Sequence, residues 1–309
     1  MERVFSAIFS TSFFVSTLKL TTPILLAALG AIFTDRAGVL NLNLEGVMLA
    51  AALGGVLGSA WTGSVFVGIL SAILIGMIIA AVLAYVGIYL KSNLVLAGTA
   101  LNLFVTGATI FVLFIVTGEK GTSTALKSGK IPKLNIPFIK DIPVVGKLLS
   151  GHSVMTYFAF LCVFIASYLI YRTAIGLRIR AVGENPDAAE SVGINVKTIK
   201  TASLLICGFF AALGGSFLSM YYVSWFQRDM TAGRGFIALA AMNLGNSTPV
   251  GTMLAALLFG ASEQLGNVLQ VMKVPPQIVL MIPYFVTLVG LVLYAIRRES
   301  KIKKLKANN

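Results

Sequence analysis

The sequence predicts an all-α polytopic membrane protein, because of its composition and the length of its apolar runs. Of the 309 residues, 57% are hydrophobic and 11% are charged, and the mean hydropathy is +0.91. A soluble globular domain carries about 25% charged residues. Runs close to the length of a membrane span fall near 64–90, 94–116, 153–171, 201–222, 250–270 and 277–296. We therefore expect one transmembrane domain, 1–309, with about eight to ten transmembrane or re-entrant helices of roughly 20 residues each.

The region 5–60 is less regular than the rest of the chain. Its apolar stretches at 5–18, 20–33 and 46–60 are interrupted by Lys19 and by a polar segment, 34–46. The first run continues past Leu26 without a convincing cleavage site. We therefore expect a retained membrane element there rather than a signal peptide.

The net charge of +13 predicts the orientation, because lysine and arginine gather on the cytoplasmic side of membrane proteins. Much of this charge lies in 172–200 and in the tail 297–309, so both are predicted to be cytoplasmic, and no nucleic-acid partner is needed to explain it. One span separates 172–200 from 117–152, which must then be an extracellular loop. That loop runs against the rule, because it carries Lys120, Lys127, Lys130, Lys133, Lys140 and Lys147. Its length and its three prolines indicate an extended segment.

Two polar, glycine-containing interruptions predict broken helices, one near 34–46 and one near 244–249. The stretch 236–248 is a short or broken crossing, and it runs into Gly245-Asn246-Ser247-Thr248-Pro249, which breaks a helix. Irregular backbone at membrane depth is tolerated only where protein covers it or where it lines a water-filled cavity. Broken helices of this kind hold the solute in many transporters. The sequence therefore places a solute pathway near both breaks.

The loop 172–200 contains the signals of a short helix of its own. Asn185 is a good N-cap, Pro186 suits the first helical position, and Asp187 favours the positive end of the helix dipole. Gly193 stands where a left-handed residue ends a helix. A folded element in a cytoplasmic loop predicts a docking site for a partner protein.

Polar side chains within the apolar regions are the candidates for contact with a solute, because charges at depth are costly. Glu45 either caps the helix that it opens or faces the pathway. Glu263 lies one helical turn from Asn267, so the two share a face and form either a structural hydrogen-bond cluster or part of the pathway. Asp35 and Arg36 either lie at the cytoplasmic interface or contribute to the pathway. The full candidate set is Asn41, Asn43, Glu45, Asn102, Asn243, Asn246, Glu263 and Asn267. Such groups suit an uncharged, hydroxylated solute.

Catalysis and bound cofactors are not expected of this chain. Cys162 and Cys207 lie in apolar runs and are interpreted as small buried hydrophobes. His152 is the single histidine, too few for a metal site or a histidine-based triad. No Gly-x4-Gly-Lys-Ser/Thr motif is present, so ATP would have to act through another chain.

Three segments together resemble the permease subunits of ATP-binding-cassette (ABC) importers of the branched-chain amino acid, ribose and nucleoside group. They are TDRAGVLNLNLEG at 34–46, GENPDAAESVGI at 183–194, and GRGFIALAA at 233–241 with GNSTPVG at 245–251. The similarity runs from about residue 20 to 296. Asp35 stands where the family more often has Glu, and Asn43 where it often has Gly. The first segment is closest to the nucleoside and simple-sugar branch.

The resemblance implies a multi-pass permease of the bacterial plasma membrane that moves a nucleoside, or alternatively a simple sugar such as ribose. It also implies three partners: a cytoplasmic ABC ATPase, a second homologous permease, and an extracytoplasmic solute-binding protein or lipoprotein. The coupling helix that would dock on the ATPase comprises Gly183, Glu184, Asn185, Pro186, Asp187, Ala188, Ala189, Val192 and Gly193. Ala188, Ala189 and Val192 would give it a small apolar face. A self-contained secondary transporter is the remaining alternative, and Glu263 is its one candidate for coupling-ion chemistry.

Overall fold

Membrane-length helices dominate the structure, a computed structural model that describes residues 10–126, 128–134, 150–271 and the single positions Met281, Phe285, Val289 and Val292. Six of its helices are long and apolar enough to cross a membrane. They are α2 (Thr11–Arg36), α3 (Leu44–Thr62), α4 (Val65–Ala84) with the π-helix η1 (Tyr85–Tyr89), α5 (Leu94–Thr117), α8 (Val154–Arg172), and α11 (Val196–Phe217) with the π-helix η2 (Leu218–Val223). The described part also holds the shorter apolar helix α12 (Arg234–Leu244) and the 23-residue α13 (Pro249–Val271), and the predicted count of eight to ten stays a prediction.

Several predicted features lie outside the described residues. The apolar run near 277–296 is described only at the four single positions, and the tail 297–309 is not described. Lys127, Lys140 and Lys147 of the predicted extracellular loop are also outside. The predictions for these segments therefore stay predictions.

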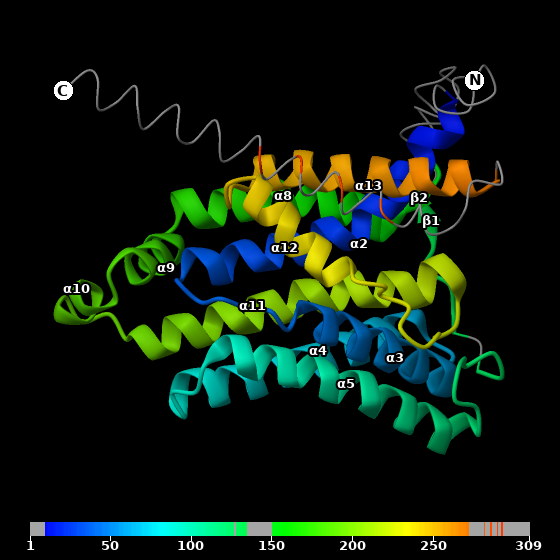
Figure 1. Ribbon diagram of the computed structural model, residues 1–309, viewed down its shortest axis with the longest axis horizontal. Coiled ribbons are helices and arrows are strands. Elements are labelled where there is room, and N and C mark those ends of the chain that lie inside the picture. The colour runs from blue at the N-terminus through cyan, green and yellow to red at the C-terminus, as the bar shows by residue number, and fades with distance from the viewer. Residues whose placement is uncertain are drawn as a thin grey trace.

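The centre of the bundle is formed by α2, α3 and α11, whereas α4 and α5 lie at one edge (Figure 1). In the most apolar stretch of each helix, 78% of α2 is buried but only 17% of α5. Glycines let the central helices meet backbone to backbone. A Cβ added at Gly215 would lie 2.1 Å from the carbonyl oxygen of Met48, and one at Gly214 would lie 2.9 Å from that of Pro23. Small residues at such contacts are the ordinary means of packing helices in a membrane.

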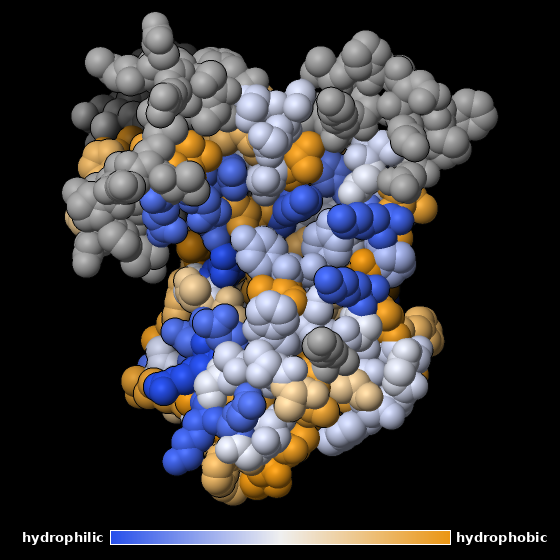
Figure 2. All heavy atoms as spheres, turned by 90° about the vertical axis from the view of Figure 1, so that its right-hand side faces the viewer, coloured by the Kyte–Doolittle hydropathy of each residue, from blue (hydrophilic) through white to orange (hydrophobic). Residues whose placement is uncertain are grey.

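Helix α2 runs without interruption through Lys19, so the break in the apolar pattern at this residue does not end a helix. Lys19 lines a cavity of about 540 Å³ together with Lys130, Lys133, Tyr221 and Tyr222. A lysine can lie within a span when its apolar stem follows the helix and its ammonium group reaches a polar space. Figure 2 shows hydrophilic side chains across this end of the molecule, which is the right-hand end in Figure 1.

The opposite end of the bundle carries two short helices, α9 (Ala174–Glu184) and α10 (Pro186–Ser191) (Figure 1). The capping predicted for α10 is confirmed: the Asn185 side chain accepts a hydrogen bond from the Ala188 amide at 3.1 Å, and Gly193 has φ +84°. Helix α9 was not predicted. It is amphipathic, and it buries Gly176, Ile179 and Val182 against the bundle.

The described part of 117–152, the loop predicted to be extracellular, is joined by backbone contacts to the segment that follows η2. Strand β1 (Lys133–Leu134) pairs antiparallel with β2 (His152–Ser153). The Ser123 amide donates to the Phe226 carbonyl at 2.8 Å, and the Arg228 amide donates to the Gly121 carbonyl at 2.8 Å. The loop thus packs on the chain that leads into α12. It lies at the opposite end of the bundle from α10, as the predicted orientation requires (Figure 1).

Candidate functional site

The first broken helix is present. Helix α2 ends at Arg36, α3 begins at Leu44, and the chain between them runs back toward the middle of the bundle (Figure 1). Asn102 of α5 holds the end of this segment, because its side-chain amide donates to the Leu42 carbonyl at 2.8 Å and accepts from the Gly46 amide at 2.8 Å. The Asn102 side chain therefore joins the two sides of the α3 start, Leu42 and Gly46, and holds the irregular segment in place. This contact was not predicted, since it joins residues far apart in sequence.

Asn41 and Asn43, two predicted pathway residues, point into the protein. Asn41 is 4% exposed; its side chain accepts from the Asn43 amide at 2.9 Å and donates to the Cys207 sulfur at 3.3 Å. Asn43 is fully buried, and within the described residues its side-chain amide has no hydrogen-bond partner. Neither side chain lines an open surface in this conformation, so the predicted contact of both with the solute stays a prediction.

The half-length helix α12 directs its N-terminus at the start of α3. The carboxylate of Glu45 accepts from the Gly233 amide at 2.8 Å with one oxygen and from the Gly235 amide at 2.6 Å with the other. Gly233 has φ +79°, and a Cβ added at Gly235 would lie 2.4 Å from the Glu45 nitrogen. An anion is stabilised at a helix N-terminus by the free amides and the dipole. Glu45 therefore caps a helix, but the helix is α12 rather than the α3 that it opens.

An ion pair lies beside this cap. The Arg234 guanidinium donates to the Glu263 carboxylate, and the two side chains are 14% and 19% exposed. Arg234 also donates to the carbonyls of Met230 and Thr231 at 3.2 and 3.3 Å. Asn267 lies one turn further along α13 and is partly buried. Of the two readings of Glu263, the contacts agree with the structural one, and Arg234 was missed.

The second interruption separates α12 from α13 and lies against the end of α2. The Arg36 side chain donates to the carbonyls of Ser247 and Asn246 at 3.0 and 3.2 Å, and the Ser247 hydroxyl donates to the Asp35 carboxylate. Asn243 and Asn246 are exposed on this side of the molecule. The structure thus brings the two predicted breaks into direct contact.

The irregular segments 37–43 and 224–233 lie on the side of the bundle that faces the viewer in Figure 1. Lipid cannot satisfy the hydrogen bonds of such backbone. This side of the molecule must therefore be covered by protein or line a water-filled path.

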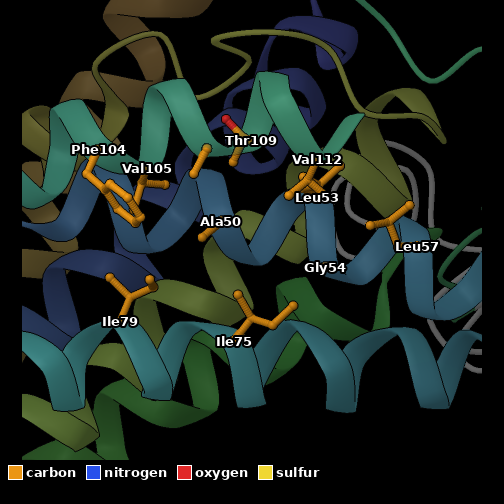
Figure 3. Close-up of a pocket in the computed structure, with 11 residues that line it drawn as sticks. Ala50, Leu53, Gly54, Leu57, Ile75, Ile79, Phe104, Val105, Thr109 and Val112 are labelled. Carbon is orange, nitrogen blue, oxygen red and sulfur yellow. The ribbon is translucent and has the colours of Figure 1, made fainter. Parts of the chain in front are cut away.

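A second cavity, of about 190 Å³, lies between α3, α4 and α5 (Figure 3). Thr109 is its one side chain with a hydroxyl, and that hydroxyl donates to the Thr106 carbonyl of its own helix at 3.0 Å. The rest of the lining is apolar, so this cavity does not suit a polar solute. Within residues 10–126, 128–134 and 150–271, no three His, Cys, Asp or Glu side chains gather to hold a metal ion.

We expect Glu263→Ala to lower the free energy of unfolding by about 3 kcal/mol, because it leaves the partly buried guanidinium of Arg234 without its counter-ion. Thermal unfolding in detergent measures the change. Replacing both partners, Arg234→Met with Glu263→Met, should recover much of the loss, and Asn267→Ala on the same face is the control with a small effect. Unchanged stability with altered affinity for the solute would instead place Glu263 in the pathway.

Comparisons with known proteins agree with the fold. The family model for the branched-chain amino acid transport system, permease component, matches residues 13–296. The guanosine ABC transporter permease NupQ of Bacillus subtilis is 34% identical over 291 residues, and the nucleoside ABC transporter permease NupC of Lactococcus lactis is 32% identical over 287; each alignment covers 89% of both chains. A Haloferax volcanii protein provisionally named a glucose ABC transporter permease, TsgC13, is 35% identical over 261 residues, 83% of this chain and 77% of its own.

A solved structure shares the fold at 16% sequence identity. It is an ABC transporter provisionally described as of the metal-chelate type, in an inward-facing conformation, with a TM-score of 0.51 over 92% of this chain and 83% of that one. The family match and the six membrane-length helices make the chain a multi-pass protein of the plasma membrane. The chain belongs to the branched-chain amino acid transport system permease family, the membrane subunits of ABC importers.

Proposed function

We propose that this chain is the permease subunit of an ABC importer that carries nucleosides. The proposal is supported by NupQ and NupC, whose names assign them to guanosine and to nucleosides and whose similarity spans 89% of the chain. A third relative, TsgC13, bears a glucose name at 35% identity, so a simple sugar is the second candidate.

The observation that supports an uncharged solute is that the charged side chains at the centre of the bundle are bound by groups of the chain itself. The Glu45 carboxylate is held by the amides of Gly233 and Gly235, and Glu263 is held by Arg234. Each charged side chain of this cluster therefore has a partner within the chain, while Nε of Arg234 and one oxygen of Glu263 are buried without a hydrogen bond among the described residues. A nucleoside or a sugar offers hydroxyl and amide-like groups instead, which an exposed side-chain amide such as that of Asn243 can bind. The same pairing disfavours Glu263 as the coupling-ion site of a secondary transporter.

The proposed pathway runs along the side of the bundle that carries 37–43 and 224–233. Asn243 and Asn246 are exposed there, and Glu45 and Asn102 are partly exposed. A second homologous permease facing this side would cover the irregular backbone, as the membrane requires. Asn41 and Asn43 then shape the wall from within rather than touch the solute.

The energy would come from a separate ATPase that docks on α10. Its caps fix a short rigid helix at the cytoplasmic end, and Ala188 and Val192 are exposed there, Val192 at 75%. Ala189 is 3% exposed and packs inward, so it does not belong to the predicted docking face. Gly183 likewise packs on the end of α2. At the other end, the loop that contacts 224–228 offers a surface to a solute-binding protein.

We expect cells that lack this chain to lose uptake of labelled guanosine, adenosine or uridine and to regain it with a plasmid copy. Glucose and ribose uptake, measured in the same cells, should be unchanged. Loss of sugar uptake with intact nucleoside uptake would assign the chain to the sugar branch. Uptake of every tested solute at the parental rate would contradict both candidates.

A further inference from the structure

The end of α2 lies between the coupling loop and the turn that joins α12 to α13. On one side, Gly183 of α9 is in close contact with the backbone at the end of α2. A Cβ added at Gly183 would lie 2.1 Å from the Arg36 carbonyl oxygen. Gly38, which follows the end of α2 and has φ +67°, is also close to Gly183. A Cβ added at Gly38 would lie 3.3 Å from the Gly183 Cα. Movement of α9 must therefore move the end of α2.

On the other side, the side chains of Asp35 and Arg36 hold the α12–α13 turn. Arg36 donates to the carbonyls of Ser247 and Asn246 at 3.0 and 3.2 Å, and Asp35 accepts from the Ser247 hydroxyl. We call this set of contacts the Arg36 junction. The guanidinium suits the task because its fixed fork of donors can reach two carbonyl oxygens at once.

The turn that the junction holds is in an unfavourable conformation. Asn246 and Ser247 are consecutive non-glycine residues with φ of +53° and +50°. Asparagine adopts the left-handed region readily, but serine keeps it only where its surroundings enforce it, and such strained residues gather at switch regions. Here the surroundings include two charged side chains from another helix. Release of the junction would let the turn relax to another conformation.

The turn is also rigidly joined to the helices on either side of it. A Cβ at Gly245 would lie 2.2 Å from the Thr252 nitrogen, so the turn is packed on the first turn of α13. The Ser247 amide donates to the Met242 carbonyl at 3.0 Å, which fixes it to the end of α12. At its other end α12 holds the carboxylate of Glu45 through Gly233 and Gly235. Displacement of the turn would shift α12 against α3.

We propose that Asp35 and Arg36 transmit motion between the coupling loop and α12, and that the Arg36 junction opens and closes in each transport cycle. The path runs from α10 through α9 to the end of α2, then through the junction to α12 and its cap on Glu45. Arg36 is thus a positioning residue for transport, outside the solute pathway. The inference rests on the proposed function for its readout, because transport is the event that the junction controls.

A reversible lock tests the junction. Asp35→Cys with Ser247→Cys replaces the carboxylate and the hydroxyl that now touch with two thiols, and the native Cys162 and Cys207 are buried, at 2% and 0% exposure. The variant is purified with its partner subunits, oxidised, and reconstituted. We expect the disulfide to form. Uptake per ATP hydrolysed should then fall by about tenfold or more, which is within the usual range of coupling between two sites. Reduction of the disulfide should restore uptake. Each single-cysteine variant, treated with the same oxidant, should be unaffected.

The opposite change, Arg36→Gln, should loosen the junction: ATP hydrolysis continues while uptake per ATP falls. Lys91→Ala removes an exposed cation from the connection between η1 and α5, outside the coupling loop, and is the matched control with normal coupling. A confirmed disulfide that leaves uptake unchanged would overturn the proposal, as would uptake per ATP at the unmodified level in Arg36→Gln. If the reduced variant and the unmodified chain transport sugars rather than nucleosides, the proposed substrate is wrong. The ratio of sugar uptake in the oxidised and the reduced variant still tests the junction.

Discussion

Ala188→Arg is expected to abolish ATP-driven uptake while the permease still accumulates in the membrane. Ala188 is exposed on α10, and its amide is fixed by the Asn185 cap at 3.1 Å, so the helix presents a rigid small-residue surface. A long cation there would hold the ATPase away and leave an unpaired charge in the contact. Labelled nucleoside uptake, co-purification of the ATPase and membrane abundance measure the three effects.

Two further substitutions on α10 distinguish a lost docking contact from a folding defect. Ala188→Ser keeps a small side chain and should retain uptake. Ala189→Arg should instead reduce the amount of folded protein, because Ala189 is buried against the chain itself. Normal uptake by Ala188→Arg, with the variant present in the membrane, would remove α10 as the docking element.

Glu45→Ala should have the largest effect on stability within the bundle. It removes the acceptor of both the Gly233 and the Gly235 amide and the negative charge at the N-terminus of α12. Hydrogen bonds to a charged group contribute about 1.5–3 kcal/mol each. We therefore expect the free energy of unfolding to fall by about 3 kcal/mol or more, with loss of uptake, since removal of the cap adds to the lost hydrogen bonds. Thermal unfolding in detergent and nucleoside uptake check the two parts.

Glu45→Gln is the matched variant, because its amide oxygen can still accept from one of the two amides. It should lose about half as much stability as Glu45→Ala, on the same count of hydrogen bonds. Wild-type stability in both variants, with a changed affinity for the solute, would show that the carboxylate faces the pathway instead.

Local signals in the sequence predicted the elements that depend on few neighbours. Asn185, Pro186 and Gly193 place the ends of α10, because capping involves residues three or four positions apart. The length of the apolar runs predicted most of the membrane helices, and the polar segment 34–46 predicted the gap between α2 and α3. These features follow from the chain itself.

Features that depend on the packing of distant helices were not predicted. The bracket formed by Asn102 on Leu42 and Gly46 joins residues 60 and 56 positions apart, and Arg234 meets Glu263 across 29. The sequence shows that these residues are polar within apolar surroundings. It does not show whether they face one another or a pathway, since that depends on how each helix is rotated.

The burial of Ala189 and the course of α9 have the same cause. Arg178 and Arg180 make the segment look like a solvated loop, although Ile179 and Val182 on the other face are buried. The Arg36 junction was also beyond sequence reasoning. It requires the ends of α2 and α12 to meet, which residues more than two hundred positions apart achieve only in the folded bundle.

Transport by a reconstituted assembly tests the account most directly. The chain, its partner permease, the ATPase and the solute-binding protein are placed in liposomes, and entry of labelled guanosine is followed with and without ATP. We predict entry that requires ATP and is lost with Ala188→Arg, whatever ion gradient is applied. Guanosine entry at the same rate without ATP, driven by an ion gradient and unaffected by Ala188→Arg, would contradict the account and identify a secondary transporter.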